Sequence, residues 1–382
     1  MRSFVTKVVI DALTAVMLPW LLLVSRVRRK EGRRRKILII QLGKIGDMVC
    51  VTPLLRSLRT WDASAEITVF GPGGTADILA GNPCVDRFIN SQNLSFAGLG
   101  GRLRLLLSLH RARFGVSIAV HPGAWNAVLG LWTSAPVRVH TRGGRLGLVG
   151  SFFHPFHTHR LVYGRGMRTY DHFMNIAQAV GAPVVPYRHE MFLSDAERRG
   201  GMQWLERHGV PEGSRVAVLS LTAGNKIKEW PLERFVEVAK HLTEKHGMHV
   251  LLSSSDTAVT SRAWGMLAPS RTVDAGGLPL RLLAAVIARA SLFISVDTGP
   301  LYIAHAFGVP LVDIVGPVHP AEQPPPPSPR VALVLPPLPC KPCSFVAETL
   351  RVSTEEQRRC LDLTTVNMVI EAADGLLRSV AA

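Results

Sequence analysis

The sequence predicts an α/β fold built from two Rossmann-like domains in tandem. Short apolar runs alternate with helical segments, this alternation occurs in two separate blocks, and small polar turns follow several of the apolar runs. Strands that alternate with helices form a parallel sheet that helices cover on both faces. Within the 382 residues, each block has the length of one domain.

The first block covers residues 36–185. It opens with an apolar strand at Lys36–Leu42, which leads through the loop Gly43–Asp47 into a helix that ends near Arg59. Strand, loop and helix in this order are the repeating unit of a parallel sheet. The same alternation predicts strands at Ala65–Gly71 and Val116–Val120 and helices at Gly74–Leu79 and Trp125–Trp132.

Two prolines and a loss of periodicity mark Ala179–Glu190 as the domain boundary, so the second block covers residues 186–382. An amphipathic helix at Thr364–Val380 closes this block. Ligands of open α/β sheets bind at the carboxyl ends of the strands, so we expect the function at a cleft between the two domains. The other predicted elements are strands at Arg215–Leu221, His249–Ser255, Leu292–Val296 and Pro310–Gly316, and helices at Pro231–His246, Leu280–Ala290 and Leu301–Phe307.

Residues 1–35 have the composition of a membrane-associating segment. Val8–Val24 is apolar apart from Asp11 and Thr14, and eight Lys or Arg residues follow it between positions 26 and 36. This apolar stretch is short for a spanning helix of about 20 residues, and Pro19 and Asp11 disfavour a span further. We therefore expect a monotopic or re-entrant anchor outside the catalytic fold, on the cytoplasmic face of the membrane. A cleaved signal peptide and a buried terminal helix are the alternatives.

The charge and cysteine content exclude several classes of protein. The net charge is +16, but half of it lies in residues 1–36, which hold ten Lys or Arg and two acidic residues. The rest of the chain has no stripe of cations and aromatic residues, which disfavours nucleic acid and suits an anionic small ligand or surface. Five cysteines in a chain of this length do not form a disulfide scaffold, which indicates a reducing cytoplasm. The dinucleotide GxGxxG motif and the Walker motif are both missing, which disfavours nicotinamide chemistry and nucleotide hydrolysis.

Three loops at predicted strand ends carry candidate site residues. In the first loop, glycines allow a ligand to approach the backbone, and Asp47 begins a helix either as a site residue or as a helix cap. In the second, Asn225–Pro231, Lys228 either lies in a solvated charged loop or binds phosphate together with the amino end of the helix that follows. In the third, Ser295–Pro300, Asp297 either contacts a ligand or holds the turn.

These loops lie within three longer segments that resemble the signature blocks of a known family. The segments are LGKIGDMVCVTPLLRSLR, NKIKEWPLERFVEVAKHL and SVDTGPLYIAHAFGVPLVDIVGPVHP. In order and spacing they resemble the family 9 glycosyltransferases, the bacterial lipopolysaccharide heptosyltransferases, over about residues 36–375. The resemblance implies a GT-B fold, in which two Rossmann-like domains face a cleft. It also implies inverting transfer of a heptose from ADP-heptose to the lipopolysaccharide inner core at the inner face of the cytoplasmic membrane.

The resemblance implies roles for individual residues. Asp47 matches the general base that takes the proton of the acceptor hydroxyl, and Lys228 matches the catalytic lysine that contacts the donor diphosphate. Neither a cofactor nor an obligate metal is implied. The implied donor-binding residues are Gly46, Thr222, Lys228, Asp297, Thr298, Gly299 and Tyr302. For a phosphorylated glycolipid acceptor the first domain offers Lys44, His121 and Arg142, with further cations at Arg56, Arg138, Arg165 and Arg168.

The resemblance does not explain two features of the sequence, the tyrosine at position 302 and a group of three cysteines near the C-terminus. Many family members have a histidine at the position of Tyr302, which can donate a hydrogen bond to phosphate but carries no positive charge. His305, three residues further along, either partly replaces that histidine or packs as an ordinary helix residue. Cys340 and Cys343 have the spacing of metal ligands, but with Cys360 they make only three cysteines, so a structural metal site and reduced thiols both stay open.

The heptosyltransferase hypothesis has two alternatives. One is a transferase of the same fold that uses another nucleotide sugar or a glycan other than the lipopolysaccharide core, which Tyr302 favours. The other is a non-catalytic protein that binds nucleotide sugars, which the presence of Asp47, Lys228 and Asp297 disfavours.

Overall fold

The chain folds into two compact units, Met1–Arg188 and His189–Ala382. The computed structural model describes residues 2–28, 36–143, 147–336, 342–346 and 354–381. Among these residues, each unit contains a six-stranded sheet whose neighbouring strands run parallel. The predicted α/β class is therefore confirmed, and the contacts place the boundary between the units three residues after the expected position 185.

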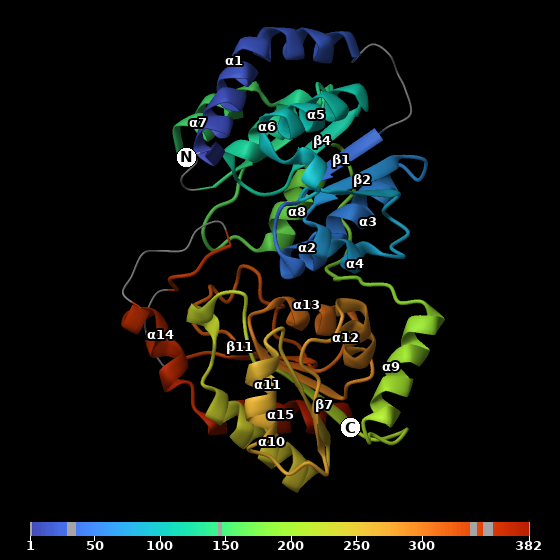
Figure 1. Ribbon diagram of the computed structural model, residues 1–382, viewed down its shortest axis with the longest axis vertical. Helices are drawn as coiled ribbons and strands as arrows, with labels where there is room; N and C mark the ends of the chain where they lie inside the picture. The colour runs from blue at the N-terminus through green and yellow to red at the C-terminus, as the bar shows by residue number, and fades with distance from the viewer. Residues whose placement is uncertain (1, 29–35, 144–146, 337–341, 347–353, 382) are drawn as a thin grey trace. The chain divides into compact units, whose positions relative to one another are not determined.

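The sheet of the first unit has the strand order β3-β2-β1-β4-β5-β6, of which β2, β1 and β4 are labelled in Figure 1. Strand β1 (Lys36–Ile40) lies at its centre, and its last four residues are fully buried because helices cover both faces of the sheet. The strand order reverses at β1, between β2 and β4, and the carboxyl edge at such a point is where ligands bind. The other strands are β2 (Glu66–Gly71), β3 (Arg87–Asn90), β4 (Val116–Ala119), β5 (Val137–Arg142) and β6 (His159–Val162).

The helix predicted after β1 is divided into two, α2 (Ile45–Cys50) and α3 (Thr52–Trp61). The helix is interrupted at Val51, two residues before Pro53. Proline lacks the backbone N–H that a continuing helix requires, but it fits the first turn of a new helix. The later helices of this unit are α4 (Ala76–Leu79), α5 (Gly98–Arg111), α6 (Ala124–Trp132), α7 (Gly147–Phe153) and α8 (Thr169–Ala179), with short 3-10 turns at Gly73–Thr75, Leu94–Phe96 and His154–Phe156.

Helix α1 (Arg2–Arg28) packs against α5 and α6 of the first unit (Figure 1). One face of the helix enters the hydrophobic core of that unit, where Leu21 is 1% exposed. A buried polar contact joins the same face to α6, because Trp132 Nε1 donates to Thr14 Oγ1 at 2.9 Å. The expectation that residues 1–35 stand outside the catalytic fold needs correction for α1. Composition marked this segment as apolar, but the contacts of one helical face make it part of the first unit.

Two leucines of α1 provide a matched test of this packing. Leu21 is 1% exposed and Leu23 is 58% exposed. Leu21→Gln removes buried apolar surface and buries an amide, so we expect it to lower the free energy of unfolding by about 3 kcal/mol. Leu23→Gln changes a solvent-facing side chain and should alter that free energy by less than about 0.5 kcal/mol. Equal urea midpoints for the two variants would show that α1 does not support the fold.

The sheet of the second unit has the order β12-β11-β10-β7-β8-β9. Its central strands, β7 (Val216–Ser220) and β10 (Leu292–Val296), are buried along their whole length. The other strands are β8 (His249–Ser253), β9 (Thr272–Asp274), β11 (Leu311–Ile314) and β12 (Val331–Val334). The strand order reverses at β7, between β8 and β10, which marks the carboxyl edge of this sheet as the second binding position.

Helices surround this second sheet, and the C-terminal one closes the unit as predicted. Helix α15 (Val366–Ala381) packs against β11, β12 and α10 (Leu232–His246). The other helices are α9 (Asp195–Arg207), α11 (Thr257–Trp264), α12 (Leu280–Ile287), α13 (Gly299–Ala306) and α14 (Thr354–Leu363), with a 3-10 turn, η4 (Lys226–Lys228), before α10.

Candidate active site

In the first unit, the loop after β1 orients the Asp47 carboxylate. Asp47 Oδ2 accepts the backbone N–H of Lys44 at 2.8 Å, as the side chain does in a capping box at the start of a helix. Gly43 is required here, because a Cβ atom at this position would lie 2.5 Å from the Cβ and Oδ2 atoms of Asp47. The Asp47 side chain is 23% exposed, so a bound molecule can reach it. Asp47 therefore caps α2 and also presents a carboxylate to solvent.

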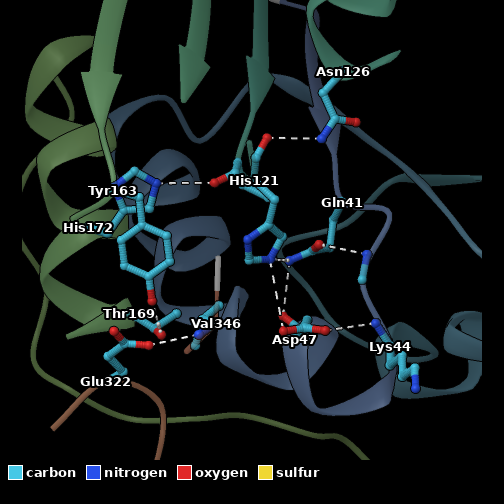
Figure 2. A network of polar contacts seen from close by, with 12 residues as sticks. Gln41, Lys44, Asp47, His121, Asn126, Tyr163, Thr169, His172, Glu322 and Val346 are labelled. Atoms are coloured by element: carbon cyan, nitrogen blue, oxygen red, sulfur yellow. Dashed lines mark hydrogen bonds and ion pairs between the residues drawn. The ribbon is translucent and has the colours of Figure 1, made fainter. Parts of the chain in front are cut away.

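His121, which follows β4, lies beside this carboxylate (Figure 2). Its Nε2 atom is 4.0 Å from Asp47 Oδ1 and 3.1 Å from the side-chain nitrogen of Gln41. The side-chain oxygen of Gln41, Oε1, accepts the Gly43 N–H, which identifies the other side-chain atom as the amide nitrogen, a donor. That nitrogen donates to His121 Nε2, so the proton of the neutral imidazole belongs on Nδ1. Burial lowers the pKa of His121 against the opposing effect of Asp47. The ring is therefore neutral at pH 7.

Further polar contacts fix the backbone around His121. Asn126 Nδ2 donates to the His121 carbonyl oxygen at 2.9 Å, and His172 Nε2 lies 3.1 Å from the Val120 carbonyl oxygen (Figure 2). The ring of Tyr163 stacks on His172 with 4.5 Å between ring centroids. Burial lowers the pKa of His172 to about 4, so its neutral ring donates the Nε2 proton to that carbonyl. The end of β4 is thus held by side chains from α6 and α8.

The expected acceptor-binding residues lie at one edge of the first sheet. Lys44, His121 and Arg142 stand at the carboxyl ends of the neighbouring strands β1, β4 and β5, and Lys44 and Arg142 are exposed. Arg138 is different, because it is 5% exposed and its guanidinium donates to the Phe156 carbonyl oxygen. Burial lowers the pKa of Arg138 to about 10. Arg138 therefore stabilises the first unit and is not available to an acceptor.

In the second unit, Lys228 and Asp297 form a largely buried ion pair. Lys228 Nζ lies 2.6 Å from Asp297 Oδ2, and the Tyr302 hydroxyl donates to the other carboxylate oxygen, Oδ1. The Asp297 side chain is 3% exposed, whereas that of Lys228 is 21% exposed. A carboxylate so deeply buried needs partners of this kind. Tyr302 is itself 2% exposed and contacts Asp297, while its expected contact with phosphate stays a prediction.

Asp313 of β11 adds a second carboxyl group to this part of the unit. It is fully buried in β11, where it pairs in register with Ser295 of β10. Neither carboxyl oxygen has a hydrogen-bond partner among the residues that the structure describes. Burial raises the pKa of Asp313 well above its usual range; Asp297 adds to this rise and Lys228 opposes it. These effects favour the neutral acid at Asp313, while Asp297 forms the ion pair with Lys228.

Most of the other expected donor residues share the carboxyl edge of the second sheet. Thr222 follows β7, and its hydroxyl lies 2.7 Å from the Ser254 hydroxyl, which follows β8. Thr298 is the N-cap residue of α13, which begins at Gly299 after β10. Gly46 is separate from this group, because it is buried within α2 of the first unit.

The structure also bears on the two features that the sequence left open. Burial lowers the pKa of His305 to about 4, and its ring packs against His189 with 4.8 Å between centroids. His305 is therefore neutral and does not supply the positive charge of a missing histidine. Of the three cysteines, Cys360 is buried in the core of the second unit and Cys343 is half-buried. Cys340 lies outside the described residues.

Sequence reasoning missed several polar residues that support these sites. Two of them gave a signal, because Gln41 directly follows an apolar strand and Asp313 interrupts one. A polar residue in a buried strand or at its carboxyl end has to be hydrogen-bonded or close to a site. His172 and Ser254 gave no comparable signal, because their partners lie 52 and 32 residues away in the sequence. Asn126 gave none either, although its partner, the His121 carbonyl oxygen, is only five residues away.

The model of the family "Glycosyltransferase family 9 (heptosyltransferase)" matches residues 103–351, which is more than half of the chain. The chain belongs to this family. Among curated relatives of this glycosyltransferase is Lipopolysaccharide heptosyltransferase 3 of Escherichia coli. The two are 26% identical over 282 residues, which cover 71% of this chain and 80% of the relative.

Solved structures agree with this assignment at the level of the fold. The family 9 glycosyltransferase of Veillonella parvula DSM 2008 aligns with a TM-score of 0.75 at 20% identity and covers 90% of this chain and 97% of that one. The E. coli ADP-heptose lps heptosyltransferase II aligns with a TM-score of 0.70 at 20% identity, over 91% of this chain and all (100%) of that one. The predicted GT-B type of fold is confirmed for this glycosyltransferase.

Proposed function

We propose that this glycosyltransferase transfers a heptose from ADP-heptose to the lipopolysaccharide inner core with inversion at the anomeric carbon. The observation that carries the proposal is the Asp47 carboxylate, which the Lys44 N–H orients at the carboxyl end of β1. The relatives support the donor and the acceptor class, since one is a lipopolysaccharide heptosyltransferase and another an ADP-heptose lps heptosyltransferase.

The first unit supplies the base. Asp47 takes the proton of the acceptor hydroxyl while that oxygen bonds to the anomeric carbon of the heptose and the carbon–oxygen bond to ADP breaks on the opposite side. General-base catalysis of this kind contributes about 10² to 10⁴ in rate. Because His121 is neutral, it adds no positive charge that would weaken the carboxylate as a base. Lys44 and Arg142 supply cations for phosphate groups on the acceptor.

The second unit supplies the charge that the leaving diphosphate needs. The Lys228 ammonium has three N–H donors, of which one is held by Asp297, so the others can donate to phosphate oxygens. Helix α13 starts beside Asp297, and the amino end of a helix stabilises negative charge. In this proposal Asp297 and Tyr302 position the lysine, and Lys228 contacts the departing ADP.

We also propose that the outer face of α1 docks on the surface of the inner membrane. By length and composition α1 could cross a membrane, but its inner face is buried against the first unit and hydrogen-bonded to Trp132. A span would break these contacts, whereas a helix that lies in the interface keeps them. Lys and Arg residues that follow the helix suit an anionic leaflet. The outer face is defined by its exposed apolar residues, Val5, Val8, Val9, Val16, Trp20, Leu23 and Val27.

Vesicle binding tests this docking. The double substitution Val16→Gln with Leu23→Gln should weaken binding to vesicles that contain phosphatidylglycerol by at least about 10-fold, because each side chain no longer enters apolar surroundings. Co-sedimentation measures the bound fraction. As a control, Met266→Gln changes an exposed apolar side chain, 42%, in the second unit and should leave binding unchanged. Equal binding of both variants would exclude the outer face of α1 as the membrane contact.

A thermal-shift comparison of nucleotide sugars tests the donor. ADP-heptose and ADP should raise the melting temperature in a concentration-dependent way, because a ligand that binds only the folded state stabilises it. A rise with UDP- or GDP-sugars alone would favour the transferase that uses another donor. A rise with ADP-heptose together with no turnover on any glycolipid would favour the non-catalytic binding protein.

A further inference from the structure

Helix α10 packs against α15 in the second unit, and a second polar cluster lies at this contact. Figure 1 labels the two helices. The Nε2 atoms of His241 and His246 lie 2.9 Å and 2.7 Å from the same oxygen, Oδ1 of Asp374. All three atoms lie within 4.8 Å of one another. The cluster is at the carboxyl end of α10, whereas Lys228 precedes its amino end, so the helix separates the two by about 20 Å. The cluster is therefore distinct from the donor-binding residues.

The charge and burial of the cluster suit a cation. The Asp374 side chain is 9% exposed and each imidazole is 19% exposed. The Asp374 carboxylate supplies a negative group, and the partly exposed rings leave solvent access to the position between the three ligand atoms.

We propose that His241, His246 and Asp374 bind a divalent transition metal ion of the zinc type. Two imidazole nitrogens and one carboxylate oxygen are a common three-residue ligand set for Zn²⁺ and its neighbours, with water in the fourth position. Ligand atoms about 2.1 Å from a tetrahedral ion lie about 3.4 Å apart. The observed separations of 2.7 Å and 2.9 Å are shorter by about 0.7 Å and 0.5 Å, and small side-chain rotations can lengthen them by this amount.

Lys245 has a defined place in this site. Its Nζ atom lies 2.6 Å from Oδ2 of Asp374, the oxygen that the histidines do not contact. This contact keeps Oδ1 directed at the imidazoles, so that Asp374 binds the ion through one oxygen, as outer-shell partners of metal ligands do. The ion would join the C-terminal helix α15 to α10, which predicts a stabilising role.

Zinc titration of the whole chain tests the proposal. The parent protein for the titration carries Cys340→Ser and Cys343→Ser, because those two cysteines have the spacing of metal ligands and could bind Zn²⁺ themselves. Calorimetry should show one Zn²⁺ per parent chain, and Co²⁺ should give the visible absorption of a tetrahedral site. His241→Gln or His246→Gln should weaken Zn²⁺ binding by at least about 10-fold. The exposed His208 lies outside the cluster, so His208→Gln serves as a matched control and should bind like the parent.

Two results would overturn the proposal. One is an absence of Zn²⁺ binding by the parent at concentrations up to about 100 µM, which would leave a cluster held by hydrogen bonds and charge alone. The other is equal affinity of His241→Gln and His208→Gln, which would place the bound ion elsewhere. The melting temperature gives an independent readout, since Zn²⁺ should raise it in the parent and not in His241→Gln. Circular dichroism before titration establishes that each variant is folded.

Discussion

Asp47→Asn is expected to lower kcat by at least about 100-fold while the melting temperature stays close to that of the wild type. The asparagine side chain retains an oxygen that can accept the Lys44 N–H, so the start of α2 keeps its cap. The amide cannot take a proton from the acceptor hydroxyl. Donor binding should persist, because the expected diphosphate contacts come from the second unit. Steady-state release of ADP measures the change in kcat.

A matched control separates catalysis from helix capping. Asp77 also lies in the first turn of a short helix of the first unit, α4, and is exposed. Asp77→Asn should leave kcat and the melting temperature unchanged. If Asp47→Asn retained the turnover of Asp77→Asn, Asp47 would be a structural cap and another group would have to be the base.

Lys228→Ala is expected to lower kcat/KM for the nucleotide sugar by about 10-fold to 150-fold, which corresponds to about 1.5 to 3 kcal/mol for a hydrogen bond to a charged group. The KM of the acceptor should change little, because the expected acceptor residues lie in the first unit. Removal of the ammonium also leaves the buried Asp297 carboxylate with the Tyr302 hydroxyl as its remaining side-chain partner among the described residues, so we expect a lower melting temperature.

Lys226 provides the control for this second prediction. It lies two residues earlier in the same 3-10 turn and is exposed. Lys226→Ala removes an equal charge without disturbing the contact with Asp297, so its kinetics should match the wild type. A similar loss of kcat/KM in both variants would mean that donor binding depends on the total positive charge of the loop and not on Lys228 in particular. An unchanged donor dependence in Lys228→Ala would place Lys228 outside the donor site.

The central strands of both sheets could be predicted from the sequence, whereas the edge strands could not. Strands β1, β7 and β10 are continuous apolar runs because both of their faces are buried. The edge strands β3 (Arg87–Asn90) and β6 (His159–Val162) have partly exposed, polar residues and carry no such pattern. Strand β5 was missed because it contains Arg138 and His140, which are buried among their own partners.

Some residues of the candidate site could likewise be predicted from the sequence, whereas their partners could not. Asp47, Lys228 and Asp297 could be located because each follows a recognisable strand or precedes a helix. Their partners could not, because Gln41 and His121 are far apart in sequence and meet only through the parallel pairing of β1 with β4. For α1 the composition was informative but incomplete. It identified an apolar helix, whereas which face packs against the first unit depends on α5 and α6.

The central claim is transfer of a heptose from ADP-heptose with Asp47 as the base, and mass spectrometry of the glycolipid product tests it most directly. Purified enzyme is incubated with lipopolysaccharide that carries a truncated inner core and with ADP-heptose, UDP-sugars or GDP-sugars in separate reactions. The wild type should add the mass of one heptose from ADP-heptose only, and Asp47→Asn should add none in the same time. Transfer by the wild type from a UDP- or GDP-sugar, with none from ADP-heptose, would contradict the account.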